Sequence, residues 1–151
     1  MCIITPDQEY IFKPFCGISL TSNYIYGGMY QEETNNLIMA SYSRGHIIII
    51  NLDDPLNPRL VKLITINGIS NLRSMDCVIW EGMLVLGNVE GNGLFYVNWE
   101  DVENCENGGS IDYYKLFEND KLTHWLQHGH VRIKKLKVFN NQLYTFPDRT
   151  N

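Results

Sequence analysis

Three histidines in the last quarter of the chain have side chains and a spacing that could bind a metal ion. His124, His128 and His130 form an H-x-x-x-H-x-H pattern, and Cys105 lies upstream as a further donor. Zinc requires three or four such ligands that converge on one point. The alternative is that His130 orients a loop while the other two histidines lie on a polar connection. We expect no bound metal or cofactor, and we keep a metal-binding or hydrolytic β-domain that uses these histidines as the alternative function.

Motifs for nucleophilic or phosphate chemistry are missing from the sequence. It contains no G-x-S-x-G turn, no P-loop, no G-x-G-x-x-G turn and no H-E-x-x-H pair. Asp53 and Asp54 are adjacent carboxylates, but Pro55 and Pro58 beside them are typical of a turn. We therefore expect a protein that is not an enzyme.

Charge is distributed unevenly along the chain. Residues 1–66 carry a net charge of −2, residues 67–120 of −8 and residues 121–151 of +5. An acidic middle beside a basic end predicts charge complementarity between neighbouring parts or with a partner. The total of −5 argues against nucleic-acid binding, which usually needs a positive footprint.

Both charged stretches also fit ordinary structural roles. Basic and apolar side chains alternate over residues 132–138, which is typical of a strand with one polar and one buried face, although such a strip could also bind phosphate or an acidic protein. The acidic side chains of residues 100–106 lack the D-x-D-x-D-G order of a calcium loop. For this segment we expect a solvated loop.

The composition predicts that the chain folds into β-strands. Alanine occurs once, at Ala40, whereas Ile, Val, Tyr, Phe, Trp and Thr are abundant, as pleated half-buried surfaces prefer. Short apolar runs are separated by clusters of Gly, Asn, Asp and Pro. The sequence predicts an all-β class without a helix longer than two turns. The expected strands are 37–43, 46–52, 60–66, 76–80, 83–88, 94–99, 111–117, 133–139 and 142–146.

The chain is similar to itself at two offsets. Residues 37–51 align with 84–98 at an offset of 47, which makes Ile48 and Phe95 equivalent buried positions, and residues 76–88 align with 136–148 at an offset of 60. Four-stranded units of about 40–50 residues are typical of propeller blades. We therefore predict one domain, 1–151, that is an incomplete β-propeller of four-stranded antiparallel blades. Roughly two and a half to three blades are expected, in units near 18–66, 71–118 and 128–151.

Residues 128–151 resemble the first half of a WD repeat. The resemblance depends on a Gly-His pair, Gly129-His130, on the apolar strand and turn that follow, and on Asp148-x-Thr150. It implies that His130 and Asp148 belong to a hydrogen-bonded structural tetrad. The segment departs from the family pattern at Phe146-Pro147, where Gly-Ser is usual. Residues 47–63 are similar to the LVIVD-type propeller repeat, and residues 25–29 to the double glycine of kelch blades.

Compartment signals in the sequence favour an intracellular location, in the cytoplasm or nucleus. The longest aliphatic run is Ile47–Ile50, whereas a membrane-spanning helix needs ~20 apolar residues. No basic cluster or apolar stretch typical of a secretory signal opens the sequence. The four cysteines form no C-x-x-C pair, so we expect free thiols in a reducing compartment and no membrane association.

These features favour a non-catalytic scaffold for protein–protein interaction. Propellers bind partners through the loops at their faces. Closed propellers use about four to eight blades, so we expect this chain to leave sheets open, to be covered by a protein partner that supplies blades or by self-association. The residues in or beside turns form our candidate interaction surface, although each tryptophan could instead pack between blades: Tyr42, Arg44, Trp80, Trp99 and Trp125.

Overall fold

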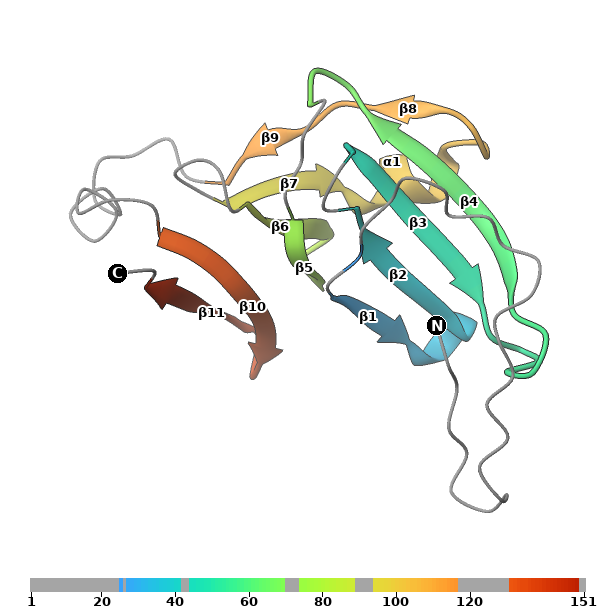
Figure 1. Cartoon of the computed structure of the whole chain (residues 1–151), viewed down its shortest axis with the longest axis horizontal. Coiled ribbons are helices and arrows are strands. Elements are labelled where there is room, and N and C mark those ends of the chain that lie inside the picture. Colours follow the sequence, from blue (N-terminus) through green and yellow to red (C-terminus); the bar gives the residue numbers. More distant parts are fainter. Residues whose placement is uncertain are drawn as a thin grey trace, which may run out of the picture.

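In the computed structural model, the described residues form three β-sheets that follow one another around an arc (Figure 1). The structure describes residues 25, 27–41, 44–69, 74–88, 94–116 and 131–149, without the side chains of residues 74, 75, 88, 131, 132 and 147–149. Within these ranges the helices are a six-residue α-helix and one 3-10 turn. The predicted all-β class without long helices is therefore confirmed for the described residues.

Sheet A contains five strands in the order β1-β2-β3-β4-β8. The first four strands are antiparallel to their neighbours, and β8 lies parallel to β4. The 3-10 turn η1 (Glu32–Thr34) connects β1 to β2. The strands are β1 (Gly28–Gln31), β2 (Asn36–Ala40), β3 (His46–Asn51), β4 (Arg59–Ile66) and β8 (Ser110–Ile111).

Sheets B and C are antiparallel throughout. Sheet B has the strand order β5-β6-β7-β9, and sheet C is the hairpin β10-β11. The helix α1 (Trp99–Asn104) directly follows β7. The strands of sheet B are β5 (Ser74–Trp80), β6 (Met83–Asn88), β7 (Leu94–Asn98) and β9 (Tyr114–Lys115), and those of sheet C are β10 (Val131–Phe139) and β11 (Gln142–Arg149).

The hairpins β2–β3 and β6–β7 share one register. Leu37 lies opposite Ile50 in sheet A, and Leu84 lies opposite Val97 in sheet B. An offset of 47 maps this pair, and each of the other pairs of β2–β3, onto a pair of β6–β7. The structure therefore confirms the 47-residue register.

The hairpins β5–β6 and β10–β11 are also equivalent, at an offset of 59 rather than the predicted 60. Each has a two-residue turn in which both residues have positive φ, Glu81-Gly82 and Asn140-Asn141. This conformation suits a type I′ hairpin turn, for which Gly and Asn are favoured. The predicted alignment was wrong by one residue because it placed the Glu81-Gly82 turn over Asn141 and Gln142.

A β-bulge repeats at the same position of β5 and β10. The first strand uses three residues where its partner strand uses two: Ser74 and Cys77 lie opposite Asn88 and Leu86, and Ile133 and Leu136 lie opposite Pro147 and Thr145. A bulge lets residues three apart point to the same side of a strand. In β10 it directs both Ile133 and Leu136 toward sheet B, where both are buried.

Apolar side chains fill the space between successive sheets. Between sheets A and B they include Ile38, Ile47 and Ile64 from one side and Leu84 and Leu86 from the other. Between sheets B and C the buried core is smaller and consists of Val85, Leu94, Ile133 and Leu136. A third cluster, Met39, Ile48 and Ile50, lies on the opposite face of sheet A.

The segment after β7 crosses from sheet B to sheet A, and two predictions fail here. The acidic stretch expected as a loop forms α1, and the strand expected over 111–117 is split between β8, on sheet A, and β9, on sheet B. Lys62 of β4 donates hydrogen bonds to the carbonyls of Val102 (3.1 Å) and Glu103 (2.6 Å) in α1. The crossing occurs because the outer edge of β4 offers backbone groups that residues 107–111 satisfy.

The predicted pair Ile48 and Phe95 is equivalent in register but not in burial. Ile48 lies opposite Met39 and is fully buried, whereas Phe95 lies opposite Leu86 and is half-buried, with its ring edge against Tyr113 at 5.3 Å between centroids. We therefore expect Ile48→Ala to lower the free energy of unfolding by about 2–5 kcal/mol, the usual cost of emptying a closed core site. Phe95→Ala should cost less, because its ring keeps contact with water. Urea unfolding of both variants checks this order, and equal losses would contradict it.

Candidate interaction surface

The outward face of sheet C, turned away from sheet B, carries exposed aromatic rings. Phe139 is 66% exposed, Phe146 49% and Tyr144 43%. The ring positions follow from the strand period: Leu136 and Leu143 pack toward sheet B, so the alternate positions of both strands point away from it. A cluster of apolar rings on a solvent-exposed face is typical of an interaction site.

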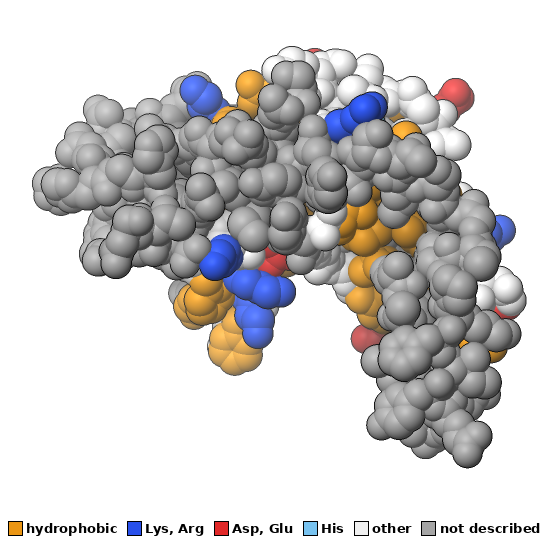
Figure 2. All heavy atoms as spheres, in the orientation of Figure 1, with side chains coloured by type: hydrophobic (Ala, Val, Ile, Leu, Met, Phe, Trp, Pro, Cys, Tyr) orange, Lys and Arg blue, Asp and Glu red, His pale blue; other side chains and the backbone are white. Residues whose placement is uncertain are grey.

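Lysines alternate with these rings on the same face. Lys137 lies directly opposite Tyr144, and Lys135 lies directly opposite Phe146, so each lysine has a ring as its cross-strand neighbour. Directly opposite side chains in an antiparallel pair lie about 4.5–5.5 Å apart at their Cβ atoms. Figure 2 shows hydrophobic and basic side chains together over the β10–β11 hairpin. We call Lys135, Lys137, Phe139, Tyr144 and Phe146 the lysine–aromatic face.

A buried carboxylate on sheet B holds β10 in place. Asp76 accepts a hydrogen bond from the backbone N–H of Leu136 (3.0 Å) and another from that of Cys77 (3.1 Å). Its side chain is 4% exposed, and Lys135 Nζ lies 4.0 Å from Asp76 Oδ2. A carboxylate in such a site is stabilised by N–H donors and a nearby cation. The position of the lysine–aromatic face therefore depends on Asp76.

The turns of sheets B and C contact each other at one end of the strands. The indole N–H of Trp80 donates to the carbonyl of Asn141 (3.1 Å), and the side-chain amide of Asn141 donates to Glu81 (3.1 Å). Toward the other end of these strands, the backbone of Gly87 lies so close to β10 that a Cβ there would be 3.1 Å from the carbonyl oxygen of Ile133. The hairpin is thus fixed at its turn, at Asp76 and along its buried face.

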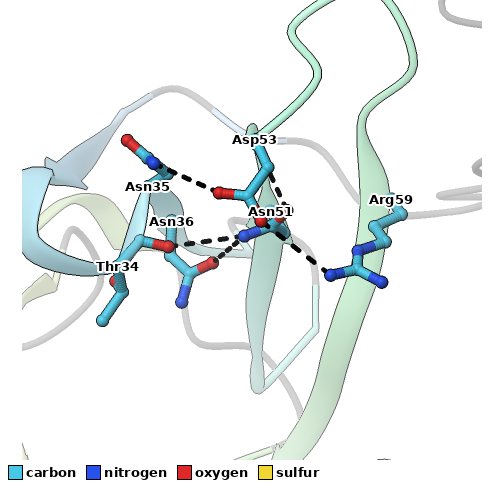
Figure 3. A network of polar contacts seen from close by, with 6 residues as sticks. All are labelled: Thr34, Asn35, Asn36, Asn51, Asp53 and Arg59. Atoms are coloured by element: carbon cyan, nitrogen blue, oxygen red, sulfur yellow. Dashed lines mark hydrogen bonds and ion pairs between the residues drawn. The ribbon is translucent and has the colours of Figure 1, made fainter.

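A second polar network fastens one end of sheet A (Figure 3). The amide of Asn51 donates to the carbonyl of Thr34 (3.4 Å) and to Asn36 Oδ1 (3.2 Å), and its own oxygen accepts the N–H of Asp53 (3.2 Å). Asp53 also accepts from Asn35 (3.1 Å) and lies 4.0 Å from Arg59. The network joins the β1–β2 turn to β3 and to Arg59 of β4, and we interpret it as a structural support of that turn.

The predicted surface residues do not form one surface. Trp80 and Trp99 lie at the same end of sheet B, because the N–H of Trp99 donates to Gly82 in the β5–β6 turn (2.8 Å), and both rings are half-buried against cores. Arg44 is exposed in the β2–β3 turn, at the opposite ends of the strands from the β1–β2 turn. Beside it, partial burial and the Arg44 charge lower the pKa of His46. Tyr42 and Trp125 lie outside the described residues.

The metal and tetrad predictions fall largely outside the described residues. His124, His128 and His130 are not among them. Cys105 is described: it is half-buried, and its thiol donates to the carbonyl of Glu106 at 3.5 Å. Asp148 pairs with Arg132 in the β10–β11 ladder, but its side chain is not described. Among the described residues, no three His, Cys, Asp or Glu side chains are grouped as metal ligands would be.

Sequence reasoning found the lysines of this face but missed its aromatic rings. The signal was present: a two-residue Asn-Asn turn sets the pairing of the strands, and a period of two then places Tyr144 and Phe146 opposite the lysines.

The described residues include no helix with the length and hydrophobicity of a membrane span.

Comparison with known proteins adds no relative. No family model matches the chain, and neither a curated protein nor a solved structure matches it.

Removal of the Asp76 carboxylate should loosen sheet C. Asp76→Ala leaves two buried N–H groups without their acceptor, so we expect the free energy of unfolding to fall by about 2–6 kcal/mol, since each orphaned donor costs ~1–3 kcal/mol. Lys135→Ala is the matched control and should cost at most ~1 kcal/mol, because that lysine is largely exposed. Urea unfolding followed by tryptophan emission measures both. Amide exchange should accelerate in β10 before β2, and unchanged protection of β10 would contradict this role of Asp76.

The two described thiols should differ in reactivity. Burial, and secondly the Asp76 charge, raise the pKa of Cys77 from 9.0 to about 12. The folded protein should therefore keep Cys77 unalkylated by iodoacetamide at pH 8, while Cys105 reacts. The unfolded thiol ionises at lower pH than the folded one, so the contribution of Cys77 to stability is full below pH 9.0 and is lost as the pH rises toward 12. Mass spectrometry of alkylated peptides, and alkaline unfolding of Cys77→Ala, check both expectations. Early labelling of Cys77 would refute them.

Proposed function

We propose that this chain is a non-catalytic scaffold for protein–protein interaction, built as part of a β-propeller of WD-like type. In this proposal sheets A, B and C are successive blades. Three repeated features support it: the 47-residue register of β2–β3 and β6–β7, the bulge shared by β5 and β10, and the shared two-residue turns. Units of this length and strand number are typical of propeller blades.

The packing between the sheets supports the same arrangement. The backbone N–H of Ile79 in β5 lies 3.1 Å from the sulfur of Met29 in β1, and Asp76 of β5 is bonded to Leu136 of β10. The first strands of the three sheets, β1, β5 and β10, thus follow one another along the inner side of the arc (Figure 1). Stacking of this kind leaves the last sheet with one face that no further sheet of the described chain covers.

The observation that carries the proposal is the lysine–aromatic face of sheet C. Rigid rings on a fixed hairpin provide large contact area at low entropic cost, and the lysines favour an acidic protein partner. The free thiols of Cys77 and Cys105 fit a reducing, intracellular compartment. We therefore place the scaffold in the cytoplasm or nucleus and infer that it binds a protein through sheet C, without nucleic acid or membrane.

Site-specific photocrosslinking tests this function on the full chain. A photoreactive phenylalanine analogue replaces Phe139 or Phe146 in cells that naturally express the protein, and replaces Leu56, which is 50% exposed on the β3–β4 connection, as the matched control. We expect adducts with one or a few proteins from the sheet C positions and not from position 56. The double variant Tyr144→Ser/Phe146→Ser should lower the adduct yield from position 139 by about tenfold or more, as removal of two anchoring rings does. The same adduct pattern at all three positions would refute the proposal.

A further inference from the structure

On the edge of β11 that faces away from β10, alternate residues present their backbone N–H and C=O groups. The N–H of Leu136 donates to Asp76 on sheet B, so it points away from β11. Residues directly opposite in an antiparallel ladder point their backbone groups either both inward or both outward. Thr145, which lies opposite Leu136, therefore directs its N–H and C=O away from β10. The same holds for Leu143 and Pro147, two residues to either side.

This edge has no partner strand within the described chain. In sheet A the second strand, β2, pairs with β3, and in sheet B the second strand, β6, pairs with β7. In sheet C the second strand is β11, and the sheet order ends there. Tyr144, Thr145 and Phe146 are exposed. Pro147 has no N–H, so the donors that the edge offers are concentrated at Leu143 and Thr145.

We propose that the edge of β11 accepts an acidic, extended segment of a partner protein as a third strand of sheet C. The inference rests on the proposed function and adds the partner's chemistry to it. Strand addition of this kind takes its affinity from backbone hydrogen bonds and its specificity from alternate side chains. Here the backbone groups of Leu143 and Thr145 supply the bonds.

The lysine–aromatic face determines the side chains of the added strand. On that face the strand lies beside Tyr144 and Phe146, and two strand spacings, about 9.6 Å, from Lys135 and Lys137. Glutamate and lysine side chains together can span this distance. Acidic residues therefore suit the outward positions of the added strand. Apolar residues suit the alternate positions, which lie beside Leu143 and point toward sheet B.

Charge and backbone hydrogen bonding together favour one occupant of this edge. A second copy that paired β11 with β11 in antiparallel fashion would add its own Lys135 and Lys137, on β10, to the same face, and would so raise the positive charge there instead of balancing it. A nucleic acid would match the lysines but would leave the open backbone groups of Leu143 and Thr145 without a strand partner. An acidic protein strand satisfies both the open backbone groups and the local basic charge.

The test uses the full chain and two capped heptapeptides. One alternates glutamate with valine, beginning and ending with glutamate, and the other replaces each glutamate by lysine. Binding is measured by fluorescence anisotropy, and the amides that shift are identified by NMR. Thr145→Pro removes the N–H at the edge without removing a β10–β11 bond, as Pro147 already does two residues away. Thr145→Val keeps the N–H and is the matched control.

We expect the glutamate peptide to bind and to shift the amides of Leu143 and Thr145. Thr145→Pro should weaken its binding by about tenfold or more, as expected for losing a central strand bond, whereas Thr145→Val should leave it unchanged. Lys137→Glu, which leaves Lys135 beside Asp76 unchanged, should weaken binding of the glutamate peptide and strengthen binding of the lysine peptide. Binding to this charge variant does not depend on the fold of the proline variant.

Several results would overturn the inference: no binding of the glutamate peptide, equal binding of both peptides, full binding by a folded Thr145→Pro variant, or shifts confined to residues outside sheet C. Tighter binding of a single-stranded oligonucleotide, or dimerisation lost in Thr145→Pro, would replace the acidic strand by another occupant. If photocrosslinks still form from position 139 but the glutamate peptide does not bind, the scaffold function is retained and only the binding of an acidic strand is refuted. Loss of both would remove the scaffold function as well.

Discussion

Strand β3 is apolar on both faces, and this property determines how the sheets are layered. Ile47 and Ile49 pack toward sheet B, whereas Ile48 and Ile50 belong to the cluster on the opposite face. A strand of this kind is stable only when both faces are covered. Sheet B meets the same requirement, because β7 contributes to the cores on both of its sides. Sheet C differs: its outward face alternates lysines with rings, so the described layers end there.

The sequence was sufficient to predict the layered hairpins but not their irregularities. The 47-residue repeat could be found because β2–β3 and β6–β7 have equal strand and turn lengths. The bulges could not, since Ile133 and Leu136 lie three residues apart and break the alternation that identifies a buried face. The division of residues 110–115 between two sheets was also hidden. It depends on the open edge of β4, which no property of the apolar run itself reveals.

The sequence predicted the lysines of the candidate surface but not its aromatic rings. The alternation of lysines with apolar residues in β10 predicted an exposed basic face, and the structure places Lys135 and Lys137 there. The rings of β11 join that face only through the pairing of the hairpin, which is a property of two strands together. The tryptophans were predicted to belong to the surface because they are large side chains beside turns. Trp80, however, uses its ring for the core and its N–H for Asn141, so it positions the hairpin instead of presenting a surface.

The crossing of residues 107–111 to β4 has a consequence for synthesis on the ribosome. Asn67, at the end of β4, bonds to Asp112, 45 residues later in the chain. At a synthesis rate of roughly 5–20 residues per second, the segment that pairs with the edge of β4 is made about 2–9 s after β4 itself. During that interval the apolar sheet A has a free edge, which can template pairing with another nascent chain. Translation that stalls between β4 and β8 would therefore release an aggregation-prone fragment, whereas stalling after β8 would release a sheet A whose β4 edge is closed.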